Sequence, residues 1–317
     1  MKVLVYGAGV LGSYLAHALV RGGNDVSVLA RGKRYKQLKE DGIVIRHHFQ
    51  RKNTVDAVNV IDQLQPQDHY DLIFVVMKYN QFPSVLPILA ENISDNIVLV
   101  GNNADAASMQ TFLNENSKVK KNMAFGFQLS GGMREDSGRI IAIHGRGQMV
   151  IGGLDGDIPF KSALEQTFKN AKYKLSFNEN IDAWLKSHMV PIAAMNAIHY
   201  MNNFDFHKIA KDKNALMQMI SVMDEGFMIL EELGYRIDPA FQVKTVRNHR
   251  IFAYHGLKIF HKLPVTKLIE GSFSEINALF EKFDELKKAV NISTPNWDAL
   301  KKQSTDKYRN EVIRDSR

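Results

Sequence analysis

The chain has 317 residues, of which 45% are hydrophobic and 9% aromatic. This composition supports packed cores and excludes a largely disordered protein, and the length suits two domains of roughly 150 residues each. The sequence contains no cysteine, which excludes disulfides, thiolate metal sites and cysteine nucleophiles. The net charge of +7 would suit a polyanion, but the basic residues are scattered and no nucleic-acid-binding motif is present. We therefore expect no nucleic-acid partner.

The first residues form a short apolar run that is much shorter than the apolar region of a signal peptide. No later run approaches the ~18 uninterrupted apolar residues that a membrane span requires. We therefore expect a soluble, cytoplasmic protein with no membrane partner.

The first thirty residues follow the order strand, helix, strand. Residues 2–6 are a short β-rich apolar run, a helical pattern starts at Val10, and Gly22 and Gly23 follow its last apolar position. Residues 25–29 form a second apolar run. These elements predict a βαβ unit with a right-handed crossover.

The alternation of strands and helices continues through the next 150 residues. Near-continuous apolar runs predict parallel strands that are buried on both faces of a sheet. Strands are expected at 70–77, 96–100 and 173–177, and helices at 84–92, 104–114 and 162–171. From residue 123 to 153, short glycine-rich segments predict antiparallel strands that close this sheet.

After residue 178 the apolar pattern becomes helical. Helices are expected at 182–201, 214–233 and 274–290, and the polar tail after Lys302 is expected to fray. The fold class is therefore α/β, with an N-terminal Rossmann-type doubly wound sheet followed by an all-helical C-terminal domain. We expect an NADP-binding domain at 1–178 and a helical domain for substrate binding and dimerisation at 179–317. Homodimerisation is a possibility that the sequence leaves open.

The pattern G-x-G-x-x-G follows the first predicted strand directly and opens the first predicted helix. Its residues are Gly7, Gly9, Val10, Leu11 and Gly12. In a dinucleotide-binding loop, the first glycine permits a tight turn and the second lets the backbone approach the pyrophosphate. The third glycine allows close packing of helix and strand, and the helix N-terminus faces the phosphates. A purely structural glycine-rich turn is the alternative.

A basic segment lies about 20 residues further on, at the end of the second predicted strand. NAD-binding proteins place Asp or Glu there for the ribose hydroxyls. This chain has Arg31, Lys33 and Arg34 instead, which suits the 2′-phosphate of NADP(H). A solvated basic loop is the alternative.

At these residues the sequence resembles the ketopantoate reductase family, whose members are 2-dehydropantoate 2-reductases and their relatives. The resemblance continues along most of the chain. It includes Met77–Tyr79, Leu99–Asn103, His144–Gly147, Ile151–Gly153, Trp184–Lys186, Glu225, Leu233–Gly234 and Ser293–Pro295. The resemblance implies transfer of a hydride from NADPH to the ketone of a small 2-oxo acid, in the pathway of pantothenate biosynthesis.

The resemblance also implies the roles of particular residues. Lys186 is expected to be the general acid, and Asn102 to line the nicotinamide and substrate pocket. Lys78 is expected near the nicotinamide, where it adds positive charge for the substrate carboxylate. Ser272 and Glu275 are the nearest candidates for two further substrate residues, although Glu275 also has the spacing of a helix cap.

The chain departs from the family beyond the lysine. Val190 and Ala194 stand where the family carries asparagines, and Asn196 lies two residues late. These changes leave open a reductase of a different, bulkier carbonyl compound, or an NADP(H)-binding redox sensor without catalysis. No metal site is expected, because no pair of histidines has ligand spacing.

Overall fold

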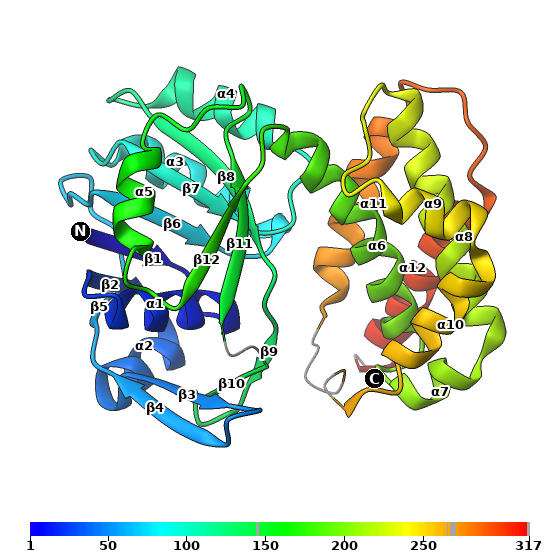
Figure 1. The fold of residues 1–317 in the computed structure, drawn as a ribbon, viewed down its shortest axis with the longest axis horizontal. Helices are drawn as coiled ribbons and strands as arrows, with labels where there is room; N and C mark the ends of the chain where they lie inside the picture. The colour runs from blue at the N-terminus through cyan, green and yellow to red at the C-terminus, as the bar shows by residue number, and fades with distance from the viewer. Residues whose placement is uncertain (144–145, 265, 267–270, 316–317) are drawn as a thin grey trace. The chain divides into compact units, whose positions relative to one another are not determined.

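The computed structural model describes residues 1–143, 146–264, 266 and 271–315. The chain forms two compact units, Met1–Ile181 and Asp182–Arg317. Figure 1 shows strands and helices alternating in the first unit and helices in the second. The α/β class, with a Rossmann-type sheet followed by a helical region, is therefore confirmed.

The first unit is built on an eight-stranded sheet with the order β12-β11-β8-β7-β6-β1-β2-β5. The strands are β1 (Lys2–Tyr6), β2 (Asp25–Leu29), β5 (Asn59–Ile61), β6 (Leu72–Val76), β7 (Asn96–Val100), β8 (Asn122–Gln128), β11 (Gly147–Gly152) and β12 (Tyr173–Phe177). Neighbouring strands are parallel except β8 and β11, which are antiparallel. The strands predicted at 2–6, 25–29, 70–77, 96–100 and 173–177 are confirmed.

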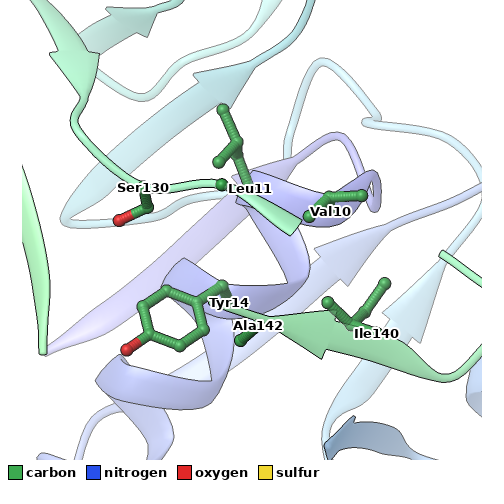
Figure 2. Close-up of a pocket in the computed structure, with 7 residues that line it drawn as sticks. Val10, Leu11, Tyr14, Ser130, Ile140 and Ala142 are labelled. Atoms are coloured by element: carbon green, nitrogen blue, oxygen red, sulfur yellow. The ribbon is translucent and has the colours of Figure 1, made fainter. Parts of the chain in front are cut away.

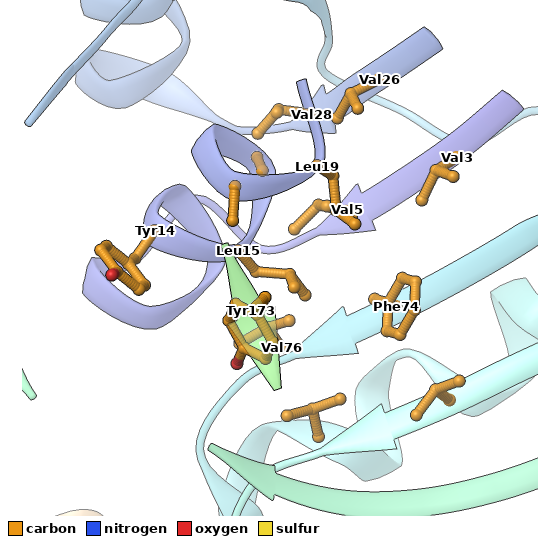
Figure 3. Close-up of a cluster of buried hydrophobic side chains, with 14 of the residues drawn as sticks. Val3, Val5, Tyr14, Leu15, Leu19, Val26, Val28, Phe74, Val76 and Tyr173 are labelled. Carbon is orange, nitrogen blue, oxygen red and sulfur yellow. The ribbon is translucent and has the colours of Figure 1, made fainter. Parts of the chain in front are cut away.

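Both faces of this sheet are buried, as near-continuous apolar strands predict. On one face the strands pack against α1 (Val10–Arg21) and α5 (Lys161–Phe168). Figure 3 shows Val3, Val5 and Phe74 of this cluster together with Leu15 and Leu19 of α1. The alternate residues of β1, β6 and β7 are also inaccessible to solvent: Leu4, Ile73, Val75, Ile97 and Leu99.

The remaining helices of the first unit are α2 (Gly32–Asp41), the 3₁₀ helix η1 (Tyr79–Ser84), α3 (Leu86–Glu91) and α4 (Ala106–Asn116). The single helix predicted at 84–92 is shorter than expected, because the chain turns through η1 before α3 begins. Pro83 lies inside η1, and Pro87 occupies the first turn of α3, where its missing N–H costs nothing.

A second sheet of four strands corrects the prediction for residues 123–153. It has the order β4-β3-β10-β9 and consists of β3 (Ile43–His47), β4 (Lys52–Asp56), β9 (Gly132–Arg134) and β10 (Ile140–Ala142). Only β8 and β11 extend the main sheet, whereas β10 pairs with β3. Figure 1 shows this second sheet beside α1, which it contacts.

The second unit contains the helices α6 to α12, with α6 beginning one residue before the unit boundary. Their bounds are α6 (Ile181–Met201), α7 (Phe206–Lys211), α8 (Lys213–Glu232), α9 (Phe241–Asn248), α10 (Arg250–Phe260), α11 (Phe273–Lys287) and α12 (Pro295–Asp315). The helices predicted at 182–201, 214–233 and 274–290 are confirmed. No helix among the residues described is long and apolar enough to span a membrane.

The prediction that the tail frays after Lys302 is wrong, because α12 continues to Asp315. Its first turn is anchored by Glu225 of α8. The carboxylate accepts the backbone N–H groups of Asn296 and Trp297 at 3.1 and 2.7 Å. Trp297 and Leu300 are completely buried, so packing holds a helix whose later sequence is largely polar.

Candidate dinucleotide site and candidate catalytic lysine

The loop between β1 and α1 has a backbone that two glycines make possible. Gly7 has φ +116°, and a Cβ there would lie 2.3 Å from the carbonyl oxygen of Val76. A Cβ on Gly12 would lie 1.9 Å from the carbonyl oxygen of Gly7. Side chains at these two positions are therefore incompatible with the close approach of β1, β6 and α1.

The same loop has the properties of an anion site. Gly9 is the N-cap of α1, no side chain caps the helix, and its first turn has no acidic residue. A Cβ at Gly9 would meet no atom within 4 Å, so the space over the loop is open. The first N–H groups of a helix and its dipole favour a negative charge, and the loop therefore fits the pyrophosphate of a dinucleotide.

The three basic residues after β2 differ in their surroundings. Arg31 is the N-cap of α2 and is exposed, and its guanidinium donates a hydrogen bond to the Tyr6 hydroxyl at 3.0 Å. Lys33 is also exposed. Both cations lie at the carboxyl end of β2, next to the strand that leads into the glycine loop.

Arg34 is buried and has a structural set of partners. Its guanidinium donates to the carbonyl oxygens of Ala8 at 3.1 Å and Gly138 at 2.7 Å, and to the Ser13 hydroxyl at 2.9 Å. Burial and the nearby Arg134 lower the pKa of Arg34 to about 10. Arg34 therefore holds the glycine loop and the turn before β10 in place, and the geometry favours Arg31 and Lys33 as the cations available to a ligand.

Lys78 and Asn102 lie at the same edge of the sheet. Each follows its strand by two residues, Lys78 after β6 and Asn102 after β7, and these strands are parallel neighbours. A Cβ on Gly101 would lie 2.3 Å from the carbonyl oxygen of Met77, so the two strand ends are tightly packed. Ligands bind at this carboxyl edge in open α/β sheets.

Ser130 is a polar residue of this edge that the sequence did not single out. Its hydroxyl is buried and has no hydrogen-bond partner among the described residues. Figure 2 shows Ser130 at a small pocket with Val10 and Leu11 of the glycine loop. The available signal was its position two residues after β8, a strand parallel to β7.

In the second unit, Lys186 lies on α6 and is only 4% exposed. Its ammonium group forms an ion pair with Asp182, one turn earlier on the helix, and lies 4.8 Å from the centre of the Tyr235 ring. Asp182 stands four residues before Lys186, a spacing at which oppositely charged side chains of a helix pair. This partner of Lys186 was therefore predictable from the sequence. Tyr235 could not be found in this way, because the contact depends on tertiary packing.

The surface of α6 beyond Lys186 packs into the helical unit. Val190 and Ala194 are completely buried. A Cβ on Gly226 of α8 would lie 2.7 Å from a methyl carbon of Val190, which shows how closely the two helices approach. An asparagine at position 190 would therefore meet α8, whereas Asn196 is only partly buried.

Other residues predicted from the sequence lie at the starts of helices or hold helices in place. Ser272 is the N-cap of α11, and Glu275 is buried in its first turn. Glu225 anchors α12. His144 and Gly145 lie outside the described residues. Within the described part of the chain, no group of three or more His, Asp or Glu side chains could hold a metal ion.

Comparison with known proteins agrees with this architecture. Residues 3–156 match the family described as ketopantoate reductase PanE/ApbA. The chain is 23% identical to a 2-dehydropantoate 2-reductase of Pyrococcus horikoshii, with 93% of each chain covered. A solved PanE/ApbA family ketopantoate reductase from Ralstonia eutropha JMP134 has 18% identity and a TM-score of 0.76, covering 96% of this chain and 97% of that one.

A second solved structure belongs to an enzyme with a different activity. It is a ternary structure of D-mandelate dehydrogenase with NADH and anilino(oxo)acetate, with 17% identity and a TM-score of 0.78. The alignment covers 98% of this chain and 99% of that one.

The fold and the glycine loop define the class of this protein as a Rossmann-type α/β fold with a helical second unit. Residues 3–156 match the ketopantoate reductase family, and 2-dehydropantoate 2-reductases that are 23% identical to the chain align over more than nine-tenths of its length. This family acts on a small 2-oxo acid.

Proposed function

We propose that the protein is an NADPH-dependent reductase that converts the ketone of a small 2-oxo acid to an alcohol, as 2-dehydropantoate 2-reductases do. The observation that carries the proposal is the buried, ion-paired Lys186 in a chain whose glycine loop fits a dinucleotide. The relatives named 2-dehydropantoate 2-reductase support the reaction class.

In this proposal Lys186 is the proton donor. NADPH held at the glycine loop would supply the hydride for the carbonyl carbon, and the Lys186 ammonium would protonate the carbonyl oxygen as negative charge develops there. Asp182 and Tyr235 hold the side chain of Lys186 in one orientation. Because the Lys186 ammonium is already held in place, little free energy is needed to reorient it when negative charge forms on the carbonyl oxygen.

The residues at the sheet edge would bind the cofactor and orient the nicotinamide and the substrate. Gly9, Val10, Leu11 and Gly12 would hold the pyrophosphate through backbone N–H groups, and Gly7, whose N–H donates to the Leu29 carbonyl oxygen at 3.3 Å, would shape the turn. The carboxamide of Asn102 and the ammonium of Lys78 would orient the nicotinamide and the substrate carboxylate. Ser272 and Glu275, at the start of α11, stay candidates for substrate contacts.

The preference for NADPH over NADH is supported by the exposed cations at the end of β2. Arg31 and Lys33 suit a 2′-phosphate, and no carboxylate stands where NAD-binding proteins carry one. The NADH-bound D-mandelate dehydrogenase has the same fold, so NADH is the alternative cofactor. We further propose a cytoplasmic location and a homodimer.

A reductase of bulkier 2-oxo acids is a second candidate function. The observation that favours it is that Val190 and Ala194 stand where the family carries asparagines: both side chains are completely buried in the helical unit, so neither position offers a hydrogen bond to a substrate hydroxyl. The solved D-mandelate dehydrogenase binds an aromatic oxo acid, anilino(oxo)acetate. A redox sensor that binds NADP(H) without turnover is the third candidate, motivated by the same two residues.

The test is the rate of NADPH oxidation with ketopantoate and with a panel of aliphatic and aromatic 2-oxo acids. Turnover with kcat/KM at or above the ~10⁴ M⁻¹s⁻¹ of ordinary enzymes supports the reductase and shows which substrate class it prefers. Tight NADPH binding without oxidation by any member of the panel would favour the sensor.

A further inference from the structure

The ammonium group of Lys186 has two neighbours of different chemistry. The Asp182 carboxylate pairs with it from one turn earlier on α6, and the centre of the Tyr235 ring lies 4.8 Å from it. The face of an aromatic ring attracts a cation but carries no exchangeable proton. Of these two neighbours in the described part of the chain, the carboxylate is therefore the one that can exchange a proton with the ammonium.

The two members of this ion pair differ in their access to water. The side chain of Lys186 is 5% exposed, whereas that of Asp182 is 22% exposed. The next residue, Ser187, is completely buried, and its hydroxyl accepts the backbone N–H of Asp238 at 3.1 Å. The segment that follows α8 is thus held against this turn of α6. Water reaches the carboxylate of the pair more readily than it reaches the ammonium.

The proposed reaction removes a proton from Lys186 in every turnover, and the present inference rests on that proposed function. When the ketone is reduced, one N–H bond of the ammonium breaks and one O–H bond forms on the alkoxide oxygen. Lys186 is then a neutral amine, and the next turnover requires one proton from water. The group that must regain the proton is the more buried member of the pair.

We propose that Asp182 returns this proton to Lys186. One carboxylate oxygen takes a proton from water and passes it to the Nζ of Lys186, which restores both the carboxylate and the ammonium. Each cycle therefore takes up one proton from water and leaves Asp182 unchanged. Carboxylic acids are much stronger acids than alkylammonium groups, so the transfer to the amine is favourable. Asp182 also lies in the first turn of α6, where the helix N-terminus favours the restored negative charge.

A pair that only stabilises the fold is the alternative, because opposite charges at this spacing support a helix. Asp284 and Lys301 form a Lys–Asp pair elsewhere in the helical unit, and their side chains are 32% and 28% exposed. In that pair the lysine is itself open to water. Asp284→Asn is therefore the matched control, since it removes a carboxylate from a Lys–Asp pair without changing the surroundings of Lys186.

The first test is rapid mixing of the NADPH-loaded natural protein, Asp182→Asn and Asp284→Asn with the best 2-oxo acid, followed by NADPH absorbance. Asparagine keeps the shape of aspartate and an oxygen that accepts from the ammonium, but it does not carry the proton. Because Lys186 begins protonated, we expect Asp182→Asn to oxidise one NADPH per active site at close to the natural rate. Later turnovers should be at least about tenfold slower, whereas Asp284→Asn should match the natural protein in both phases.

The second test adds imidazole to Asp182→Asn at constant pH and ionic strength. Imidazolium is a small acid that can protonate Lys186 in place of the missing carboxylate. We expect the slow phase to accelerate with imidazole concentration, while the first turnover stays the same. A slow phase that does not respond to imidazole would show that another step, such as product release, has become limiting, and it would overturn the proposal.

Two further results contradict the role of Asp182 and leave the reductase function intact. Natural steady-state turnover in Asp182→Asn would show that water protonates Lys186 directly. A first turnover slowed as much as the later ones would show that Asp182 only orients Lys186. A natural protein that binds NADPH but oxidises it with no 2-oxo acid would instead overturn the proposed function, and the role of Asp182 with it.

Discussion

The ammonium of Lys186 pairs with the Asp182 carboxylate and lies over the Tyr235 ring. We expect Lys186→Met to lower kcat by roughly 10²–10⁴, which is typical for the loss of a general acid. Cofactor affinity, measured by quenching of protein fluorescence, should change little, because Lys186 is not part of the glycine loop. A kcat within twofold of the natural protein on its best substrate would remove Lys186 from the mechanism.

Two histidines of the helical unit form a buried pair whose protons can be assigned. His261 Nδ1 faces the Leu257 carbonyl oxygen at 2.7 Å and must donate to it, so His261 Nε2 accepts from His199 Nε2. His199 Nδ1 is then an acceptor without a partner among the described residues. Burial, and to a smaller extent the neighbouring His261, lower the pKa of His199 to about 3.

This pair predicts acid sensitivity. The unfolded chain takes up protons on His199 below pH 6.5, whereas the folded chain resists this down to about pH 3, so stability falls as the pH falls through this window. The loss is at most ~1.4 kcal/mol per pH unit for one histidine. In urea unfolding at pH 7 and pH 5, His199→Gln should show a smaller pH dependence than the natural protein, while the exposed His69→Gln should match it. An unchanged dependence in His199→Gln would refute the assignment.

Residue roles were predictable from the sequence only where they depend on local spacing. The glycine pattern indicates the loop because strand, glycines and helix are consecutive. The sequence grouped Arg34 with Arg31 as a phosphate ligand, but burial separates them, since Arg34 contacts Gly138 more than a hundred residues away. Tyr235 and Ser130 have no local signal of comparable strength.

At the scale of elements, α1 and α2 are joined through Arg34, whereas Arg31 occupies the N-cap position of α2 and is exposed. This difference predicts opposite results for two arginine substitutions. Arg34→Met should lower the free energy of unfolding by about 1–3 kcal/mol, because buried acceptors lose a charged donor. Arg31→Met should leave stability unchanged and raise the KM for NADPH by about tenfold, with little effect on NADH, because it removes a charged phosphate contact.

The measurements are urea unfolding and initial rates with each cofactor. Equal effects of Arg31→Met on NADPH and NADH would show that Arg31 does not read the 2′-phosphate. Full stability of Arg34→Met would show that its hydrogen bonds are replaced by water.

The strands of the main sheet were predictable because continuous apolar runs indicate burial on both faces. The second sheet was not, because β3 and β10 pair across almost a hundred residues and their short segments carry no signal of that pairing. The helix α12 was missed for a related reason. Its polar sequence suggests fraying, while Trp297 and the Glu225 anchor, which tie it to α8, act through tertiary contacts.

At the scale of the whole molecule, the proposed reaction assigns a dinucleotide loop to the first unit and a proton donor to the second. The family relationship supports the reaction class, whereas the changes at Val190 and Ala194 concern the choice of substrate. The central claim is therefore hydride transfer to a 2-oxo acid.

The most direct test is mass spectrometry of the product formed from the best 2-oxo acid with NADPH that carries deuterium at nicotinamide C4, using each C4 epimer in turn. The account predicts a 2-hydroxy acid with one deuterium at C2 from one epimer and none from the other. A product without deuterium from either epimer, or no product from any 2-oxo acid while NADPH binds tightly, would contradict it.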